Sequence, residues 1–199
     1  MLDSVLRPLI DPPLNRAARL IARTGIGANA LTLAGVVAGI AAAAAIASQR
    51  YGLGLALIVL NRLLDGLDGP LARLRGSTDF GGYLDIVSDF VFYAAVPLGF
   101  GLAEPVNRLP ALVLLASFLG AGASFLAYAI IAAKRGMETT AQGAKSFYFA
   151  GGLAEGTETI IAFVLACLWP GHFAAIAYAY AAICTATVLG RIAGARRQF

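Results

Sequence analysis

Residues 65–89 read DGLDGPLARLRGSTDFGGYLDIVSD and carry five aspartates, four of them in two pairs at helical spacing. Asp65 and Asp68 are three residues apart and Asp85 and Asp89 are four apart, so each pair shares one face of a helix. Both pairs lie in or beside long apolar runs, where a carboxylate at membrane depth costs at least a few kcal/mol. An acid in such a place is a functional candidate, so this stretch decides both the fold class and the chemistry.

The composition of the whole chain indicates an integral membrane protein. Of the 199 residues, 59% are hydrophobic and 13% are charged, and the mean hydropathy is +0.79. A soluble domain carries about 25% charged residues. The net charge of +4 does not indicate nucleic-acid binding, because the basic residues are spread over the flanks of the apolar runs. We expect one domain over residues 1–199 and no nucleic-acid partner.

Six apolar runs are long enough to cross the hydrocarbon core of a bilayer, which takes about 20 helical residues. They fall at about 27–48, 52–73, 82–103, 109–133, 149–169 and 172–192. Before them, residues 12–23 (PPLNRAARLIAR) place three arginines on one helical face and aliphatic residues on the other. We therefore predict an all-α membrane protein with six transmembrane helices and an N-terminal amphipathic helix in the membrane interface. The alternative for that segment is a polar leader before the first span.

The distribution of basic residues predicts the orientation. They gather before the first run, after the second and fourth runs, and at the end of the chain: Arg7, Arg16, Arg19, Arg23, Arg73, Arg75, Lys134, Arg135, Lys145, Arg191, Arg196 and Arg197. The opposite loops hold Arg50 and Arg108. By the positive-inside rule both termini are cytoplasmic, and the aspartate pairs lie toward the cytoplasmic ends of the second and third spans.

The aspartates have neighbours that suit a phosphate ligand. On a helix over residues 61–75, Asp65, Asp68 and Ala72 form one stripe, with Gly69 and Arg73 beside it. The two small residues let a ligand approach the backbone, and the arginine can meet an anion. Facing carboxylates without His or Cys favour Mg²⁺, Mn²⁺ or Ca²⁺ in a two-metal centre for phosphoryl transfer. The sequence GxxxxGK[ST] is absent, which argues against an ATP-driven machine.

The complete pattern D-x₂-D-G-x₂-A-R-x₇-G-x₃-D-x₃-D resembles the signature of the CDP-alcohol phosphotransferase family, which is also called the CDP-alcohol phosphatidyltransferase family. It is formed by Asp65, Asp68, Gly69, Ala72, Arg73, Gly81, Asp85 and Asp89. The segment KSFYFAGGLAEGTETI, residues 145–160, adds a resemblance to bacterial inner-membrane members whose acceptor is not assigned.

The resemblance implies an enzyme of phospholipid biosynthesis. It would transfer a phosphatidyl or similar group from CDP-diacylglycerol, or another CDP-alcohol, to a small hydroxyl acceptor and release CMP. Two divalent cations, Mg²⁺ or Mn²⁺, would be held by Asp65, Asp68 and Asp85, with Asp89 completing the second position. Asp89 would also be the general base.

The CDP-alcohol site implied by the resemblance consists of Gly69, Ala72, Arg73, Thr78, Asp79, Asn29 and Thr32. The match of Asn29 and Thr32 to a family N-x-x-T is one explanation of these two residues, and a helix N-cap is the other. Related enzymes often have a small hydroxyl residue near the nucleotide. In this chain either Thr78 or Asp79 would take its place.

The acceptor is left open by the sequence. Glu155 and Glu158 suit an acceptor with hydroxyls or an amine, whereas Lys134, Arg135 and Lys145 suit a phosphorylated one. A polyol, an amino alcohol and a sugar phosphate all remain candidates for the acceptor. We also expect Arg62 to pair with an acid or to line the cavity. The alternative is that its stem packs within the span while its charged end reaches the membrane interface.

The resemblance further implies a homodimer in the bacterial inner membrane. Gly120 and Gly122 offer a small-residue face for that contact, and packing inside the chain explains them equally well. Two other functions are considered: a membrane cation carrier, and an inactive relative that binds metal and nucleotide. The carrier would need acids along the whole membrane depth, and the inactive relative is disfavoured by four intact aspartates.

Overall fold

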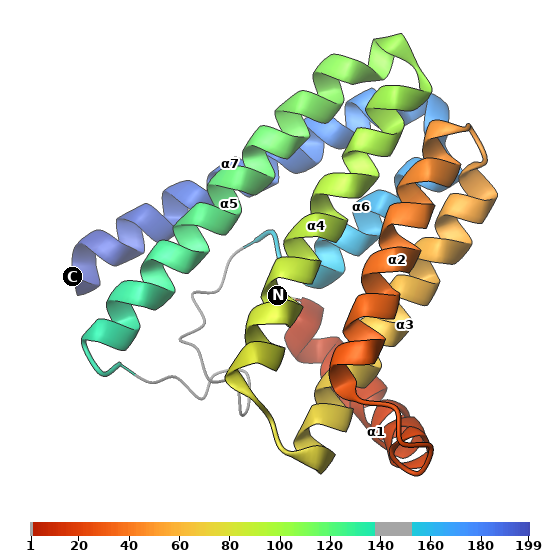
Figure 1. Cartoon of the computed structure of the whole chain (residues 1–199). Coiled ribbons are helices and arrows are strands. Elements are labelled where there is room, and N and C mark those ends of the chain that lie inside the picture. The colour runs from red at the N-terminus through yellow and green to blue at the C-terminus, as the bar shows by residue number, and fades with distance from the viewer. Residues whose placement is uncertain (1, 138–152) are drawn as a thin grey trace.

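The computed structural model describes residues 2–137 and 153–199, and within these ranges it contains helices and no strand (Figure 1). The helices are α1 (Leu2–Ala22), α2 (Ala28–Ala47), α3 (Tyr51–Arg75), α4 (Asp79–Ala103), α5 (Arg108–Lys134), α6 (Gly156–Leu168) and α7 (Phe173–Gln198). Short 3₁₀ turns, η1 (Pro105–Asn107) and η2 (Pro170–His172), lead into α5 and α7. The predicted all-α class is confirmed for this part of the chain.

Four helical segments are long and apolar enough to cross a membrane: α2, α4, α5 with its leading turn, and α7 with its leading turn. Helix α3 has 25 residues, but its second half carries the charged residues of the aspartate segment. Helix α6 has 13 residues and begins at Gly156 after the non-helical residues 153–155, so the prediction that the run at 149–169 is helical from its start is wrong there. Residues 149–152 lie outside the described residues. A total of six spans therefore stays a prediction.

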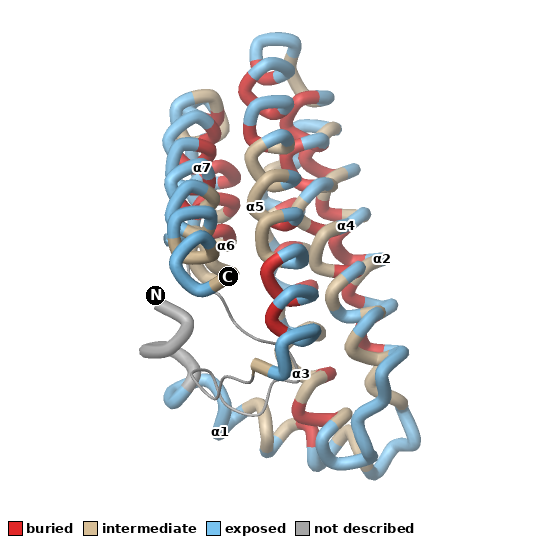
Figure 2. Tube along the Cα trace, turned by 90° about the vertical axis from the view of Figure 1, so that its left-hand side faces the viewer, coloured by how far each residue is buried: buried red, intermediate tan, exposed pale blue. Residues whose placement is uncertain are grey.

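The exposed surface of the bundle is apolar, as a protein surrounded by lipid requires. Large hydrophobic side chains such as Val37, Leu98 and Leu119 are more than half exposed. Figure 2 shows buried residues on the inward faces of the helices and exposed ones on the outward faces. Contiguous exposed apolar surface on this scale would not be stable in water.

Helix α1 begins at Leu2, so the prediction that it starts at Pro12 is wrong. Pro12 and Pro13 lie inside the helix on an exposed stretch, where water can satisfy the carbonyls that lose their N–H partners. The amphipathic pattern is present: the arginines of residues 12–23 are exposed, and Ala18 is fully buried against Leu31 and Leu71. The helix crosses the end of the bundle at which α3 ends and α4 begins (Figure 1).

Glycines set the close packing of α2 against α3 and α4. A Cβ on Gly99 would lie 2.6 Å from the carbonyl oxygen of Ala43, and one on Gly54 would lie 2.5 Å from the Ile46 side chain. Without side chains at these points the helix axes can approach closely, as in other membrane bundles. This packing fixes α3 and α4, which carry the aspartates, against the common partner α2.

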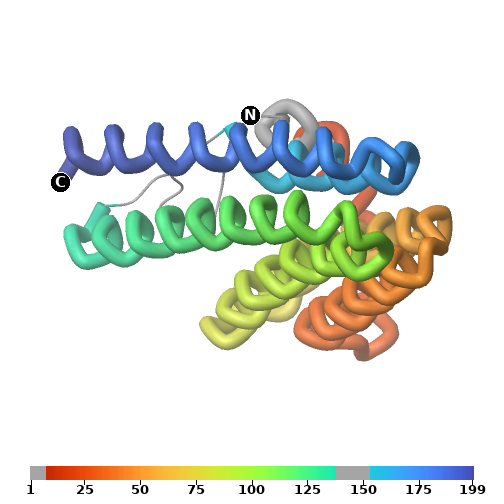
Figure 3. Tube along the Cα trace, turned by 90° about the horizontal axis from the view of Figure 1, so that it is seen from above, coloured from red at the N-terminus to blue at the C-terminus, as the bar shows by residue number. Residues whose placement is uncertain are grey.

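Helices α5 and α7 run side by side and form the second layer of the molecule (Figure 3). The two glycines of α5 face neighbours inside the chain. A Cβ on Gly122 would clash with the Phe90 ring at 2.2 Å, and one on Gly120 would lie 3.8 Å from Val188. The structure therefore supports internal packing as the explanation of these glycines, and a dimer contact there has no support from it.

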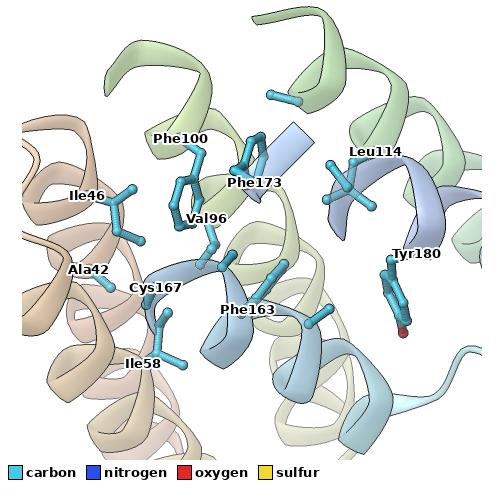
Figure 4. Close-up of a cluster of buried hydrophobic side chains, with 14 of the residues drawn as sticks. Ala42, Ile46, Ile58, Val96, Phe100, Leu114, Phe163, Cys167, Phe173 and Tyr180 are labelled. Carbon is cyan, nitrogen blue, oxygen red and sulfur yellow. The ribbon is translucent and has the colours of Figure 1, made fainter. Parts of the chain in front are cut away.

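Helix α6 joins the two layers through an aromatic core (Figure 4). The rings of Phe100 and Phe173 stack with centroids 4.4 Å apart, and Phe163 packs edge-on against Phe92 at 5.8 Å. In a bilayer such contacts stabilise the bundle by dispersion, since lipid is as apolar as the side chains. The core fills the bundle on the side of the aspartates that is away from α1.

Candidate functional site

A cavity of about 700 Å³ opens where α2, α3 and α4 face α5, the start of α6 and α7. Its wall carries the acids of the aspartate segment together with basic, hydroxyl and aromatic side chains. Three of the acids lie on it directly: Asp68, Asp85 and Asp89. The volume is typical of a site for a small molecule or a lipid head group.

The carboxylates of Asp65, Asp68 and Asp85 converge, each offering one oxygen within 4.8 Å of the others. The first two come from one face of α3 and the third from the first turns of α4. Helix α4 begins at the right place because the Thr78 hydroxyl caps it, accepting the Gly81 N–H at 3.0 Å. Ligand oxygens around one Mg²⁺ lie about 3–4 Å apart, so small side-chain adjustments suffice to hold an ion here.

The donor set fits a hard divalent cation. All three groups are carboxylates, and Mg²⁺, Mn²⁺ and Ca²⁺ prefer oxygen ligands. Two of the three are half-buried or buried, so their mutual repulsion is poorly screened by solvent. A bound cation would remove that repulsion.

Thr32 of α2 holds one of the three carboxylates. Its hydroxyl donates to Oδ2 of Asp68 at 2.6 Å, and both residues are about 6% exposed. The alternative that Thr32 and Asn29 serve as an N-cap is wrong, since Gly27 caps α2 without a side-chain hydrogen bond. Both residues line the cavity.

The fourth aspartate, Asp89, is bound to an arginine and stands outside the three-carboxylate cluster. Nη1 of Arg62 donates to Oδ1 of Asp89 at 3.1 Å and lies 3.4 Å from Oδ2 of Asp65. The expectation that Arg62 pairs with an acid is confirmed. Its Nε donates to Asn61 Oδ1 at 2.7 Å, and its guanidinium lies 4.3 Å from the Phe92 ring centre.

Most of the residues that the resemblance assigns to the CDP-alcohol are brought together on one wall of the cavity: Asn29, Thr32, Gly69, Ala72, Arg73 and Thr78. Asp79 lies outside this wall, because its side chain is exposed on the first turn of α4. A Cβ on Gly81 would lie 3.1 Å from Thr78 Oγ1 and 3.2 Å from Asn29 Oδ1. Gly81 therefore lets the polar groups of α2 and α4 meet.

The expected acceptor residues separate in the structure. Glu155 lines the cavity, whereas Glu158 lies one turn further along α6 and is not part of the described wall. Lys134 is exposed at the end of α5. Arg135 donates to the carbonyls of Gln198 and Phe199 at 3.1 and 2.9 Å, so it fixes the end of α7.

These contacts explain why Arg135 and Lys134 lie away from the cavity: the end of α5 packs against the end of α7 beyond it. An acceptor role for either residue has no geometric basis here. Lys145 lies outside the described residues.

Arg191 of α7 lines the cavity, although its place at the end of the last apolar run indicates only an orienting charge. Its Nη1 donates to the Ala121 carbonyl at 2.9 Å and lies 3.4 Å from Ser124 Oγ. The missed signal is its spacing of seven residues from Cys184, which shares the cavity wall. Arg75, which the sequence places at the flank of the second apolar run, also lines the cavity and donates to the Ala22 carbonyl at 2.7 Å.

Fold and site together define a class of protein: a helical bundle of membrane type, with carboxylates from two helices converging beside a cavity. The family described as CDP-alcohol phosphatidyltransferase matches residues 26–191, and the chain belongs to this family.

Two relatives show how far the similarity extends. The inner membrane protein YnjF of Escherichia coli K12 is 49% identical over 193 residues, which is 96% of this chain and 94% of that protein. The archaetidylinositol phosphate synthase of Pyrococcus horikoshii is 33% identical over 105 residues, 52% of this chain and 56% of that protein.

Solved structures share the fold. The phosphatidylinositol phosphate synthase PgsA1 of Mycobacterium tuberculosis, in complex with manganese and citrate, superimposes with a TM-score of 0.71 at 23% identity. The match covers 90% of this chain and 87% of that one. The same enzyme with CDP-DAG bound gives a TM-score of 0.71 at 21% identity, covering 90% and 91%.

Proposed function

We propose that the chain transfers a substituted phosphate group, such as phosphatidyl, from a CDP-alcohol to a hydroxyl acceptor and releases CMP. The observation that carries the proposal is the convergence of Asp65, Asp68 and Asp85 within 4.8 Å beside a cavity that also holds Arg73. Family membership and the fold shared with an enzyme described with CDP-DAG bound support the same reaction class.

The proposed cofactors are two divalent cations, Mg²⁺ or Mn²⁺. Asp65, Asp68 and Asp85 would hold the first, and Asp89 would complete the second position with oxygens shared from the cluster. When bound, such cations neutralise phosphate charge and stabilise the attacking and leaving oxygens of a displacement.

The donor binds along the wall formed by α2, α3 and α4. Arg73 meets the phosphates, and Gly69 and Ala72 leave the backbone open to the nucleotide. Asn29 and Thr78 supply polar groups beside it. The apolar chains of the donor stay in the lipid, next to the exposed hydrophobic surface of the same helices.

Asp89 is the proposed general base. The acceptor oxygen attacks the β-phosphorus of the CDP-alcohol, the bond to the CMP oxygen breaks, and Asp89 takes the hydroxyl proton. The reaction moves one substituted phosphate group and requires no oxidant or further cosubstrate.

We propose that the acceptor enters beside Glu155 and Arg191, across the cavity from Arg73. The carboxylate suits hydroxyl groups and the guanidinium suits a phosphate, so a phosphorylated polyol fits both. The names of two relatives, archaetidylinositol phosphate synthase and phosphatidylinositol phosphate synthase, describe enzymes whose products carry such a group. A polyol and an amino alcohol are the alternatives that the assay below compares.

The proposed location is the bacterial inner membrane, with both termini and the cavity mouth on the cytoplasmic side. The name of the E. coli relative and the exposed arginine face of α1 support it. A homodimer is part of the proposal and rests on the family resemblance. The cation-carrier alternative has no observation in its favour, because the aromatic core fills the described bundle beyond Asp89.

The test is CMP release by the purified protein in lipid micelles with CDP-diacylglycerol and Mg²⁺ or Mn²⁺. The acceptor panel contains inositol phosphate, glycerol 3-phosphate, inositol, serine, choline and ethanolamine. Acceptor-dependent release that EDTA stops and that Asp65→Asn abolishes would establish the reaction. If the native protein binds neither a divalent cation nor CDP, the proposal is refuted.

A further inference from the structure

Arg62 bridges two carboxylates that the proposed function assigns to metal binding. One nitrogen, Nη1, lies 3.1 Å from Asp89 Oδ1 and 3.4 Å from Asp65 Oδ2. Its side chain is 19% exposed, so this charge is largely removed from solvent. The guanidinium therefore stands where a cation bound to both aspartates would have to be accommodated.

Two further contacts hold the guanidinium in this position. Its Nε donates to Oδ1 of Asn61 at 2.7 Å, and the Asn61 amide donates to the carbonyl of Gly35 on α2 at 2.8 Å. On its other side it lies over the Phe92 ring at 4.3 Å. The position is thus built by residues of α2, α3 and α4 and does not depend on the two aspartates alone.

The arginine affects the two proposed cation positions unequally. At the three-carboxylate cluster it touches one ligand, Asp65. At the second position it touches two of the proposed ligands, Asp65 and Asp89. A divalent ion there competes with the guanidinium for the same carboxylates and is repelled by its charge.

We propose that Arg62 is a resident counter-ion that must give up its contacts with Asp65 and Asp89 before the second cation binds. The first cation then binds tightly at the cluster, and the second binds more weakly. Arg62 sets the difference between the two affinities, which makes it a positioning residue for Asp89. This inference rests on the proposed function, because it concerns the cations of that same site.

The experiment is a Mn²⁺ titration of the purified full-length protein in detergent, without substrates. Electron paramagnetic resonance counts free Mn²⁺ and detects the coupled signal of two ions about 4 Å apart, the usual spacing in two-metal sites. For the native protein we expect two ions with dissociation constants at least about tenfold apart, within the range usual for coupled sites. The coupled signal should appear with the second ion.

The main variant is Arg62→Gln, which removes the charge. It should bind the second ion about tenfold more tightly and leave the first nearly unchanged. Arg62→Lys keeps a charge but lacks the planar guanidinium. Its affinity for the second ion should therefore lie between those of the native protein and Arg62→Gln. If Arg62→Gln does not yield folded protein, Arg62→Lys alone still tests whether the affinity for the second ion rises.

Arg191→Gln is the matched control, because it removes the same charge from the cavity wall without removing a contact of Asp65 or Asp89. It should leave the ratio of the two affinities unchanged. Two ions of equal affinity in the native protein would overturn the inference. It would also be overturned if Arg62→Gln bound the second ion no more tightly than the native protein does. A single ion in both proteins would do the same. No Mn²⁺ binding at all would instead refute the proposed function.

Discussion

The hydroxyl of Thr32 donates to Oδ2 of Asp68 across 2.6 Å, and this contact ties α2 to the aspartate cluster on α3. Both side chains are almost fully buried, so water does not compete with the bond. It occupies one oxygen of Asp68, which fixes the direction of the other. Thr32 therefore orients a proposed metal ligand as well as lining the cavity.

Thr32→Val should weaken divalent-cation binding by about 10- to 100-fold, the usual cost of losing a hydrogen bond that orients a metal ligand. The valine keeps the shape of threonine but offers no donor, so Asp68 loses its fixed orientation. Mn²⁺ binding by paramagnetic resonance measures the effect. Thr32→Ser keeps the hydroxyl and should stay close to the native affinity; equal binding by the valine variant would show that the bond has no such role.

Much of the fold follows from local patterns that the sequence displays directly. The first four apolar runs predicted the ends of α2 to α5 within three residues, because in lipid the backbone hydrogen bonds must be satisfied within the helix. The last two runs were less accurate: α6 begins at Gly156, and α7 continues to Gln198. The start of α1 was misplaced, since prolines are poor inside helices and only the exposure of that stretch makes them tolerable. Side-chain exposure depends on the tertiary structure and is not readable from the local sequence.

The site was predictable to a similar extent. The helical spacing of the aspartates places Asp65 and Asp68 on one face, and the structure brings Asp85 of α4 beside them, as the family resemblance implies. Of the expected acceptor residues only Glu155 is found on the cavity wall, because the positions of the others depend on how α5 and α7 pack. Arg135 looks like Arg191 in sequence, yet one contacts the chain end and the other lines the cavity.

Asp89→Asn should abolish CMP release while leaving the fold and CDP binding intact. The amide keeps the size of the side chain but cannot accept the hydroxyl proton, and losing a general base typically costs about 10²- to 10⁴-fold in rate. Single-turnover CMP release, with size-exclusion profiles as the control for folding, measures the effect. Release at the native rate would remove Asp89 from the mechanism.

Arg73→Ala should raise the KM for the CDP-alcohol far more than the KM for the acceptor. Arg73 lines the donor wall beside Gly69. The alanine variant would lose the contact between the guanidinium and the donor phosphates. A charged hydrogen bond of this kind contributes about 1.5–3 kcal/mol, so an increase of roughly 10- to 150-fold is expected.

Arg135→Ala is the matched control for this experiment. It also removes an arginine, but one that contacts the Gln198 and Phe199 carbonyls outside the cavity. Both of its KM values should stay near those of the native protein. Equal changes in donor and acceptor KM for Arg73→Ala would contradict the assigned role.

Gly99→Ala should destabilise the bundle by about 1–3 kcal/mol, the usual cost of overpacking a close helix contact. The added Cβ would lie 2.6 Å from the Ala43 carbonyl oxygen, and backbone cannot move aside as a flexible side chain can. Gly52→Ala is the matched control, since it is also helical and its Cβ would meet nothing within 4 Å. Thermal unfolding in detergent should therefore show a lower Tm for the first variant and an unchanged or higher Tm for the second. If both variants unfold alike, the close approach of α2 and α4 is not what requires glycine at this position.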